Sequence, residues 1–155
     1  MFNLFNKKED FLAPISGELI AIEKVNDPVF AQKMMGDGFG IIPCDSMVYA
    51  PMSGTVTVCF PTNHAVGIES DDGKEYLIHI GINTVELQGK GFTPHVVQGQ
   101  KIKQGDPLIA IDLEEIKKLG YDSTVLVIFP NRTIELKEEL KAIKDHQAIA
   151  IKFCK

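Results

Sequence analysis

The chain has 155 residues, 45% of them apolar, which fits one domain with a core of its own. Its formal net charge of −5 leaves no basic surface for phosphates, so nucleic acid is excluded as a partner. The three cysteines are far apart and lack metal-finger spacing, which predicts reduced thiols in a cytoplasmic protein.

The first ten residues, MFNLFNKKED, lack the apolar run of a signal peptide. No segment approaches the roughly 18 apolar residues that a membrane-spanning helix needs. We expect a mobile tail at 1–10 and a single domain at 11–155. Phe2, Leu4 and Phe5 allow at most peripheral membrane contact.

Short β-rich runs separated by Gly, Pro, Asn and Asp follow one another along the chain, which predicts an all-β fold, an antiparallel sandwich or barrel. Two short helices connect them: 27–36, with Asp27 as N-cap and Pro28 in the first turn, and 112–120, with Asp112 as N-cap. The predicted strands are 17–22, 38–43, 54–60, 64–70, 75–81, 106–112, 124–129, 133–136 and 147–153.

A weak internal repeat precedes two of these strands. LAPISGELIAI at 12–22 and VYAPMSGTVTV at 48–58 share Ala-Pro-x-Ser-Gly before an alternating run. The repeat suggests two similarly shaped halves, and independent use of the same turn chemistry is the alternative.

Two of the four histidines lie in the predicted hairpin 62–81. Asp72-Gly73 predicts a two-residue type I′ turn, which would place Val66 opposite His79. His64 and His79 then share one face as a diagonal pair about 7–8 Å apart at the backbone. A three-residue loop would instead place the two rings on opposite faces.

The paired imidazoles suggest a zinc site, an acid–base pair or a nucleophilic imidazole. Zinc lacks a third ligand nearby, so we expect neither a metal nor a cofactor, and an acid–base hydrolase lacks a nucleophile on this face. At a pKa near 6.5, roughly three quarters of a histidine is neutral at pH 7 and offers a free lone pair. The remaining possibility is that His79 acts as a nucleophile and His64 assists it.

The segment FPTNHAVGIESDDGKEYLIHIGINTVELQGKGF, with DPVFAQKMMGDG and APMSGTV before it and GQKIKQGDPLIAID after it, closely resembles the glucose-type enzyme IIA of the bacterial phosphoenolpyruvate-dependent sugar phosphotransferase system. The resemblance runs from about Phe11 to Ile151. It implies a β-sandwich that takes a phosphoryl group from the carrier protein HPr and passes it to a cysteine of a sugar-specific IIB domain.

The resemblance also implies roles for single residues. His79 matches the phosphorylated histidine, which attacks through Nε2 while the Gly81 carbonyl holds Nδ1–H. His64 matches a second histidine that steadies the phosphoryl oxygens and is oriented by the Thr62 hydroxyl. The apolar collar that excludes water matches Phe30, Phe60, Val66 and Leu77.

Two positions concern docking to HPr. Asp27 matches an acidic residue that meets a basic residue of HPr. Asn83 stands where the family commonly has Asp, so one charge is missing from the docking rim.

Three other functional classes share features with this sequence. Zinc endopeptidases of related fold need H-x-x-x-D and H-x-H ligand sets, and both fail here. Biotinyl or lipoyl carriers expose a lysine in a characteristic hairpin that is missing. A regulatory protein that binds its targets through the same face is not distinguishable by sequence from a phosphocarrier.

Overall fold

The computed structural model describes residues 9–137 and 141–154. The predicted tail 1–10 falls mainly outside this range, but Glu9 is included and accepts hydrogen bonds from the backbone and hydroxyl of Ser53 at 2.8 and 2.7 Å. In the described part of the chain no helix is long and apolar enough to cross a membrane.

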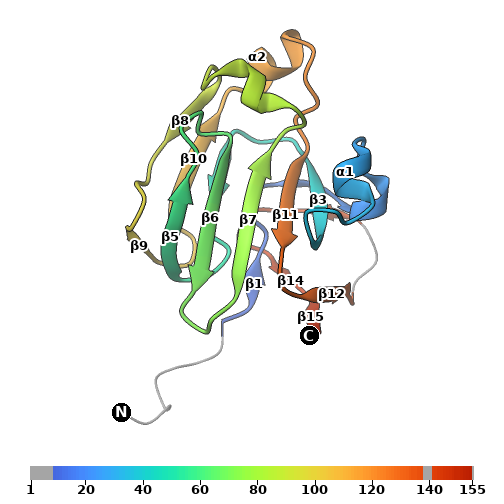
Figure 1. Cartoon of the computed structure of the whole chain (residues 1–155), viewed down its shortest axis with the longest axis vertical. Coiled ribbons are helices and arrows are strands. Elements are labelled where there is room, and N and C mark those ends of the chain that lie inside the picture. The colour runs from blue at the N-terminus through green and yellow to red at the C-terminus, as the bar shows by residue number, and fades with distance from the viewer. Residues whose placement is uncertain (1–8, 138–140, 155) are drawn as a thin grey trace.

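Short strands dominate the fold, as predicted (Figure 1). The strands are β1 (Phe11–Leu12), β2 (Gly17–Ala21), β3 (Asp37–Pro43), β4 (Met47–Tyr49), β5 (Gly54–Cys59), β6 (Ala65–Ser70), β7 (Glu75–Ile80), β8 (Phe92–Pro94), β9 (Lys101–Ile102), β10 (Pro107–Ile111), β11 (Val125–Phe129), β12 (Thr133–Leu136), β13 (Ala142–Ile143), β14 (Ala148–Ile149) and β15 (Ile151–Cys154).

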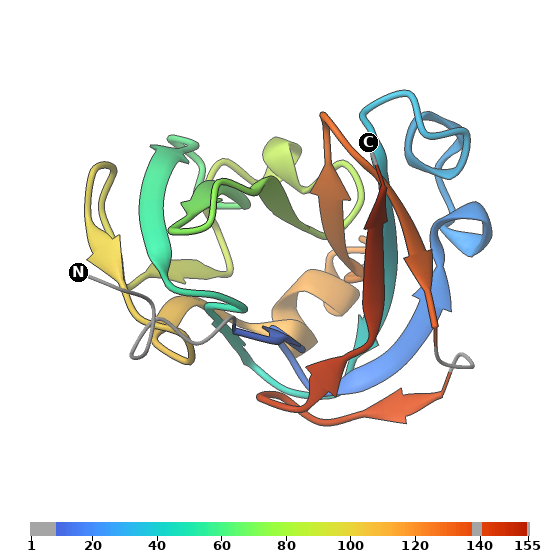
Figure 2. The same cartoon turned by 90° about the horizontal axis from the view of Figure 1, so that it is seen from below.

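The main sheet has the strand order β13-β2-β3-β11-β7-β6-β5-β9, and β4-β10-β8 form a second sheet. Two further two-stranded sheets, β1-β14 and β12-β15, complete the sandwich. Figure 2, a view from below, shows the strands arranged around the interior of the fold. Every paired strand is antiparallel, which confirms the predicted fold class.

Both predicted helices form, but the first is shorter than predicted and ends at Ala31 rather than near Gly36. In α1 (Pro28–Ala31) the Asp27 carboxylate accepts a hydrogen bond from Val29 N at 2.8 Å. In α2 (Leu113–Lys118) the Asp112 carboxylate accepts one from Glu115 N at 3.1 Å. These side chains satisfy amide groups that have no partner within the helix. Two 3₁₀ turns, η1 (Ile22–Lys24) and η2 (Thr84–Leu87), are additional connectors.

The internal repeat is visible in the hydrogen bonds. Leu12 N donates to Pro51 O at 3.1 Å, and Tyr49 N donates to Pro14 O at 2.7 Å, so the two Ala-Pro segments exchange equivalent bonds. The next residues repeat the arrangement, since the hydroxyl of each repeat serine accepts a 2.9 Å bond from a backbone amide: Ser53 from Gln104 N and Ser16 from Asp145 N. The described residues therefore contain two similar halves packed against each other.

The 62–81 hairpin differs from its predicted register. Ser70 pairs with Lys74 around a three-residue loop, because Ser70 Oγ accepts from Lys74 N at 2.9 Å and Gly73 takes a φ of 89°. Three-residue hairpins commonly place glycine at this left-handed position. His79 therefore lies opposite Ala65, and Val66 lies opposite Ile78. The predicted pairing of Val66 with His79 is wrong by one residue.

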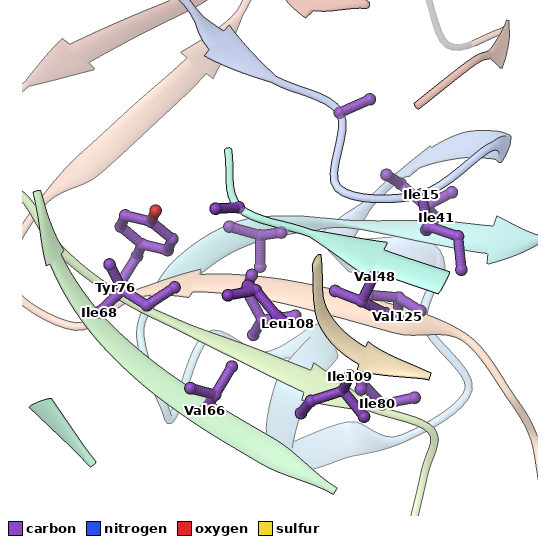
Figure 3. Packing of buried hydrophobic residues seen from close by; sticks show 14 of the residues in the cluster. Ile15, Ile41, Val48, Val66, Ile68, Tyr76, Ile80, Leu108, Ile109 and Val125 are labelled. Carbon is purple, nitrogen blue, oxygen red and sulfur yellow. The ribbon is translucent and has the colours of Figure 1, made fainter. Parts of the chain in front are cut away.

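The shift decides which side chains enter the core. Val66, Ile68, Tyr76 and Ile80 point into the main apolar cluster between the sheets (Figure 3). The alternate positions of β7, Leu77 and His79, lie on the opposite face. Val66 is thus a core residue with no exposed surface, and its predicted place in the collar around the histidines is wrong.

The repeat glycines lie where another strand passes very close. A Cβ at Gly17 would lie 2.8 Å from the Ile42 carbonyl carbon, and one at Gly54 would lie 2.8 Å from Ser70 Cα. Each would be closer still to a backbone carbonyl oxygen. Only glycine allows these strands to approach so closely.

We predict that Gly17→Ala and Gly54→Ala each lower the free energy of unfolding by about 2 kcal/mol or more, because backbone atoms would have to move. Urea unfolding measures the loss. Gly40→Ala is the matched control, since its Cβ would meet the flexible Ile20 side chain at 3.1 Å, and its loss should be smaller. Wild-type stability in the first two variants would contradict the close packing.

Candidate functional site

The rings of His64 and His79 meet at one end of the β6–β7 hairpin, away from its turn. Their centroids are 5.0 Å apart and their planes are inclined by 80°. His64 is 5% exposed, and His79 is half-buried. The structure therefore brings together the two histidines that the sequence singled out.

The two rings meet although the register differs, because His64 precedes β6 and does not follow strand alternation. Phe60 N donates to Ala65 O at 3.2 Å and Asn63 N donates to Phe60 O at 2.8 Å, which closes a tight loop. Asn63 has a φ of 57°, a left-handed conformation that asparagine tolerates well. This loop, and not the Asp72-Gly73 turn, carries His64 to the face of His79.

His79 is oriented by the residue two positions later. Its Nδ1 lies 2.9 Å from the Gly81 carbonyl oxygen. Because a carbonyl only accepts, Nδ1 must carry the proton, and the lone pair of a neutral ring is then on Nε2. The predicted contact between His79 and the Gly81 carbonyl is therefore present, and it leaves Nε2 with a free lone pair.

His64 is oriented by the hydroxyl of Thr62, which is hydrogen-bonded to Nδ1. A hydroxyl can donate or accept. When Thr62 donates, the proton of His64 lies on Nε2, and this nitrogen can donate to an anionic oxygen. The Thr62–His64 pair thus complements a nucleophilic His79.

Apolar side chains surround the two rings. The Phe30 centroid is 5.0 Å from that of His79, and the Phe60 centroid is 5.5 Å from that of His64. Leu77 lies two residues before His79 on the same face of β7 and packs on the smaller apolar cluster. Three of the four predicted collar residues therefore lie at the site.

One apolar residue next to His79, Leu126, was not predicted from the sequence. Leu126 of β11 lies directly opposite His79, is completely buried, and belongs to the same cluster as Phe30. Its signal was present, because alternate residues of TVLVIF had to face away from the main core. The remaining members of this cluster are Ile22, Val25, Ile82 and Ile128.

The apolar surroundings keep both imidazoles neutral. Burial, together with the neighbouring His64, lowers the pKa of His79 to about 4, while the Gly81 carbonyl and the Asp27 carboxylate act in the opposite direction. Burial also lowers the pKa of His64. The free lone pair on His79 is therefore available throughout the neutral range.

Asn83 and Asp27 lie at the rim. Asn83 is exposed, precedes η2 with a φ of 60°, and follows Gly81 by two residues. Asp27 caps the helix that carries Phe30. Both predicted docking residues thus belong to elements that border the histidines.

The other two histidines are elsewhere. His95 is exposed beyond β8, and His146 lies beside Asp145 and Tyr49 in the β13–β14 turn. Among residues 9–137 and 141–154, no three His, Cys, Asp or Glu side chains form a group that could hold a metal ion.

The lowered pKa of His79 predicts a pH dependence of stability. The unfolded chain, with a histidine pKa near 6.5, binds the proton more readily than the folded one, so stability falls as pH drops from 6.5 towards 4. Between pH 7 and pH 5, His79 should account for up to about 2 kcal/mol of lost stability. Urea unfolding of the wild type and His79→Gln at both pH values measures this difference, and equal losses in the two proteins would refute it.

Comparison with known proteins places this site in a family. The sequence model described as phosphoenolpyruvate-dependent sugar phosphotransferase system, EIIA 1, matches residues 9–134. A solved structure described as glucose permease IIA from Mycoplasma capricolum has a TM-score of 0.84 and 39% identity, covering 97% of this chain and 99% of that chain.

Relatives occur both as single components and as parts of larger proteins. The chain is 51% identical over 136 residues to a glucose-specific EIIA component of Staphylococcus aureus, covering 85% of this chain and 82% of that protein. It is 48% identical over 123 residues to a glucose-specific EIICBA component of Streptococcus pneumoniae, covering 79% of this chain but only 17% of that protein. The chain belongs to the EIIA 1 family of the phosphoenolpyruvate-dependent sugar phosphotransferase system, and its role is that of a phosphocarrier.

Proposed function

We propose that Nε2 of His79 carries the phosphoryl group. The observation that supports this most is the 2.9 Å contact between His79 Nδ1 and the Gly81 carbonyl, which leaves the lone pair on Nε2. In the forward step, Nε2 attacks the phosphorus of the phosphohistidine of HPr. The N–P bond of HPr breaks, its ring regains the electron pair, and a new N–P bond forms on His79.

Transfer onward reverses these roles. A cysteine thiolate of a IIB domain attacks the phosphorus, and the N–P bond of His79 breaks. We propose that His64 donates from Nε2–H to the phosphoryl oxygens in both steps, with Thr62 holding its Nδ1. Such a donor stabilises charge without moving a proton, which suits phosphoryl transfer.

The apolar collar protects the intermediate. Phe30 is only 7% exposed, and with Phe60 and Leu77 it limits the access of water to the rings. A phosphoimidazole in this position would hydrolyse slowly and await a protein acceptor.

Partner docking has support from the exposed surface near the histidines. Val29 is 41% exposed next to Phe30, and Val85 is 51% exposed two residues after Asn83. Large apolar residues at a protein surface favour protein partners. Asp27 offers a negative charge to a basic HPr, and the neutral Asn83 weakens this attraction.

The proposed setting is the cytoplasm, where HPr and IIB domains operate. Single-component relatives are named as glucose-specific, so we propose a glucose-type sugar system as the one that this phosphocarrier serves.

The first prediction from this function concerns His79. Phosphoenolpyruvate carrying ³²P, with enzyme I and HPr, should label the protein with one acid-labile, alkali-stable phosphoryl group. His79→Ala should lose the label completely, because no other nucleophile replaces Nε2. His95→Ala, a substitution at an exposed histidine outside the site, should be labelled like the wild type. Labelling of His79→Ala would show that the phosphoryl group is carried elsewhere.

The second prediction concerns His64. His64→Gln should still reach full labelling from HPr, because the nucleophile is intact and slower acceptance only delays the label, but it should transfer the phosphoryl group to a IIB domain at least tenfold more slowly. Single-turnover transfer from the ³²P-labelled variant to a glucose-specific IIB domain measures this rate. Thr62→Ser keeps the hydroxyl and serves as the control with near-normal transfer. An undiminished rate in His64→Gln would remove His64 from the mechanism.

A further inference from the structure

Hydrogen bonds fix the orientation of the two peptide groups on either side of Gly81. One of these groups supplies the carbonyl that holds the His79 ring. Each peptide group offers one N–H and one carbonyl. One of these four groups, the Gly81 carbonyl, accepts the hydrogen bond from His79 Nδ1. The other three groups, Ile80 C=O, Gly81 N–H and Ile82 N–H, are hydrogen-bonded to Thr84, Thr124 and Asp122 and not to the imidazole ring.

Thr84 holds the first peptide group. Its hydroxyl donates to the Ile80 carbonyl, and its side chain is completely buried at the start of η2. On the other side of the same peptide, Gly81 N donates to Thr124 O at 2.8 Å. Hydrogen bonds to both the carbonyl and the N–H therefore fix the plane of the peptide group between Ile80 and Gly81.

The loop before β11 holds the second peptide group. Ile82 N donates to Asp122 O at 2.9 Å. The Asp122 carboxylate in turn accepts from Thr124 N at 2.9 Å and from Thr124 Oγ1 at 2.6 Å, which closes the loop on itself. Asp122 and Thr124 thus present two carbonyls to Gly81 and Ile82 as one unit.

Packing leaves little freedom at Gly81 itself. Its φ of 82° is in the left-handed region, and a Cβ there would lie 2.9 Å from the Asp122 carbonyl oxygen and closer still to the Thr84 side chain. Because both neighbouring planes are held, the direction of the Gly81 carbonyl follows from them. That carbonyl then decides which nitrogen of His79 carries the proton.

We propose that Thr84 and Asp122 are positioning residues for phosphoryl transfer, which orient the Gly81 carbonyl and so keep the His79 proton on Nδ1 and the lone pair on Nε2. This inference rests on the proposed role of His79 as phosphoryl carrier. It adds residues that touch neither the phosphoryl group nor its partner proteins.

The test is the tautomer of His79, read by long-range ¹H–¹⁵N NMR of the folded protein at pH 7.5. In the wild type the resonances should report a protonated Nδ1 and an unprotonated Nε2. Thr84→Val removes the hydroxyl while keeping the side-chain volume, and it should shift His79 to a mixture of tautomers. In the same variant kcat for acceptance from phospho-HPr should fall at least tenfold, with KM unchanged because the docking surface is intact.

Three further proteins make the test decisive. Thr84→Ser should restore both the tautomer and kcat, since it keeps the hydroxyl. Asp122→Ala opens the loop and should reproduce the tautomer shift, which keeps the test available should Thr84→Val not fold. Val56→Ala destabilises the core from β5, where Val56 is buried and pairs with Ile68, so the His79 tautomer in this variant should remain that of the wild type.

The proposal is overturned if folded Thr84→Val and Asp122→Ala both retain the wild-type tautomer. A wild type that takes no phosphoryl group from HPr would instead refute the proposed function. The NMR result would still decide whether Thr84 and Asp122 position the ring, so the two failures are distinguishable.

Discussion

The hydrogen bond from His79 Nδ1 to the Gly81 carbonyl is the interaction on which the site depends. Histidine has two chemically similar nitrogens, and without a fixed acceptor on one of them neither would reliably present a lone pair. The fold supplies that acceptor locally, because the strand ends at Ile80 and the chain turns at Gly81 with a φ of 82°. The orientation of the His79 ring is therefore a consequence of how one strand terminates.

The sandwich around this strand end is built twice. The Ala-Pro-x-Ser-Gly segments exchange equivalent backbone bonds, and each ends in a glycine pressed against a neighbouring strand. Such close backbone contact leaves no room for a side chain at either glycine. At the centre of the main sheet, β7 contributes His79 and its neighbour β11 contributes Leu126 opposite it. His79 therefore lies beside an apolar surface that a neighbouring strand provides.

The sequence was sufficient for the fold class, the helix caps and the identity of the two histidines, because each depends on local patterns. The register of the 62–81 hairpin was not, since Asp72-Gly73 suits either a two-residue or a three-residue loop. The Ser70 hydroxyl, bonded to Lys74 N, accompanies the longer loop and moves Val66 into the core. The prediction that His64 shares a face with His79 was right, but the reason given for it, strand alternation, was wrong. A loop with a left-handed Asn63 places the His64 ring. The bond from Thr84 to the Ile80 carbonyl is local, but the backbone bonds from Gly81 to Thr124 and from Ile82 to Asp122 join segments about 40 residues apart, and no local pattern reveals them.

Burial serves two chemical requirements at this site. It lowers the pKa of His79 to about 4, which keeps the ring neutral, and it would limit the access of water to the phosphoimidazole that we propose. A lower pKa also makes the imidazole a weaker nucleophile and a better leaving group. For the carrier role that we propose for His79 this is an advantage, because the same nitrogen then first attacks phosphorus and later releases it. The half-buried position of His79 therefore suits reversible transfer between two proteins better than either full exposure or full burial would.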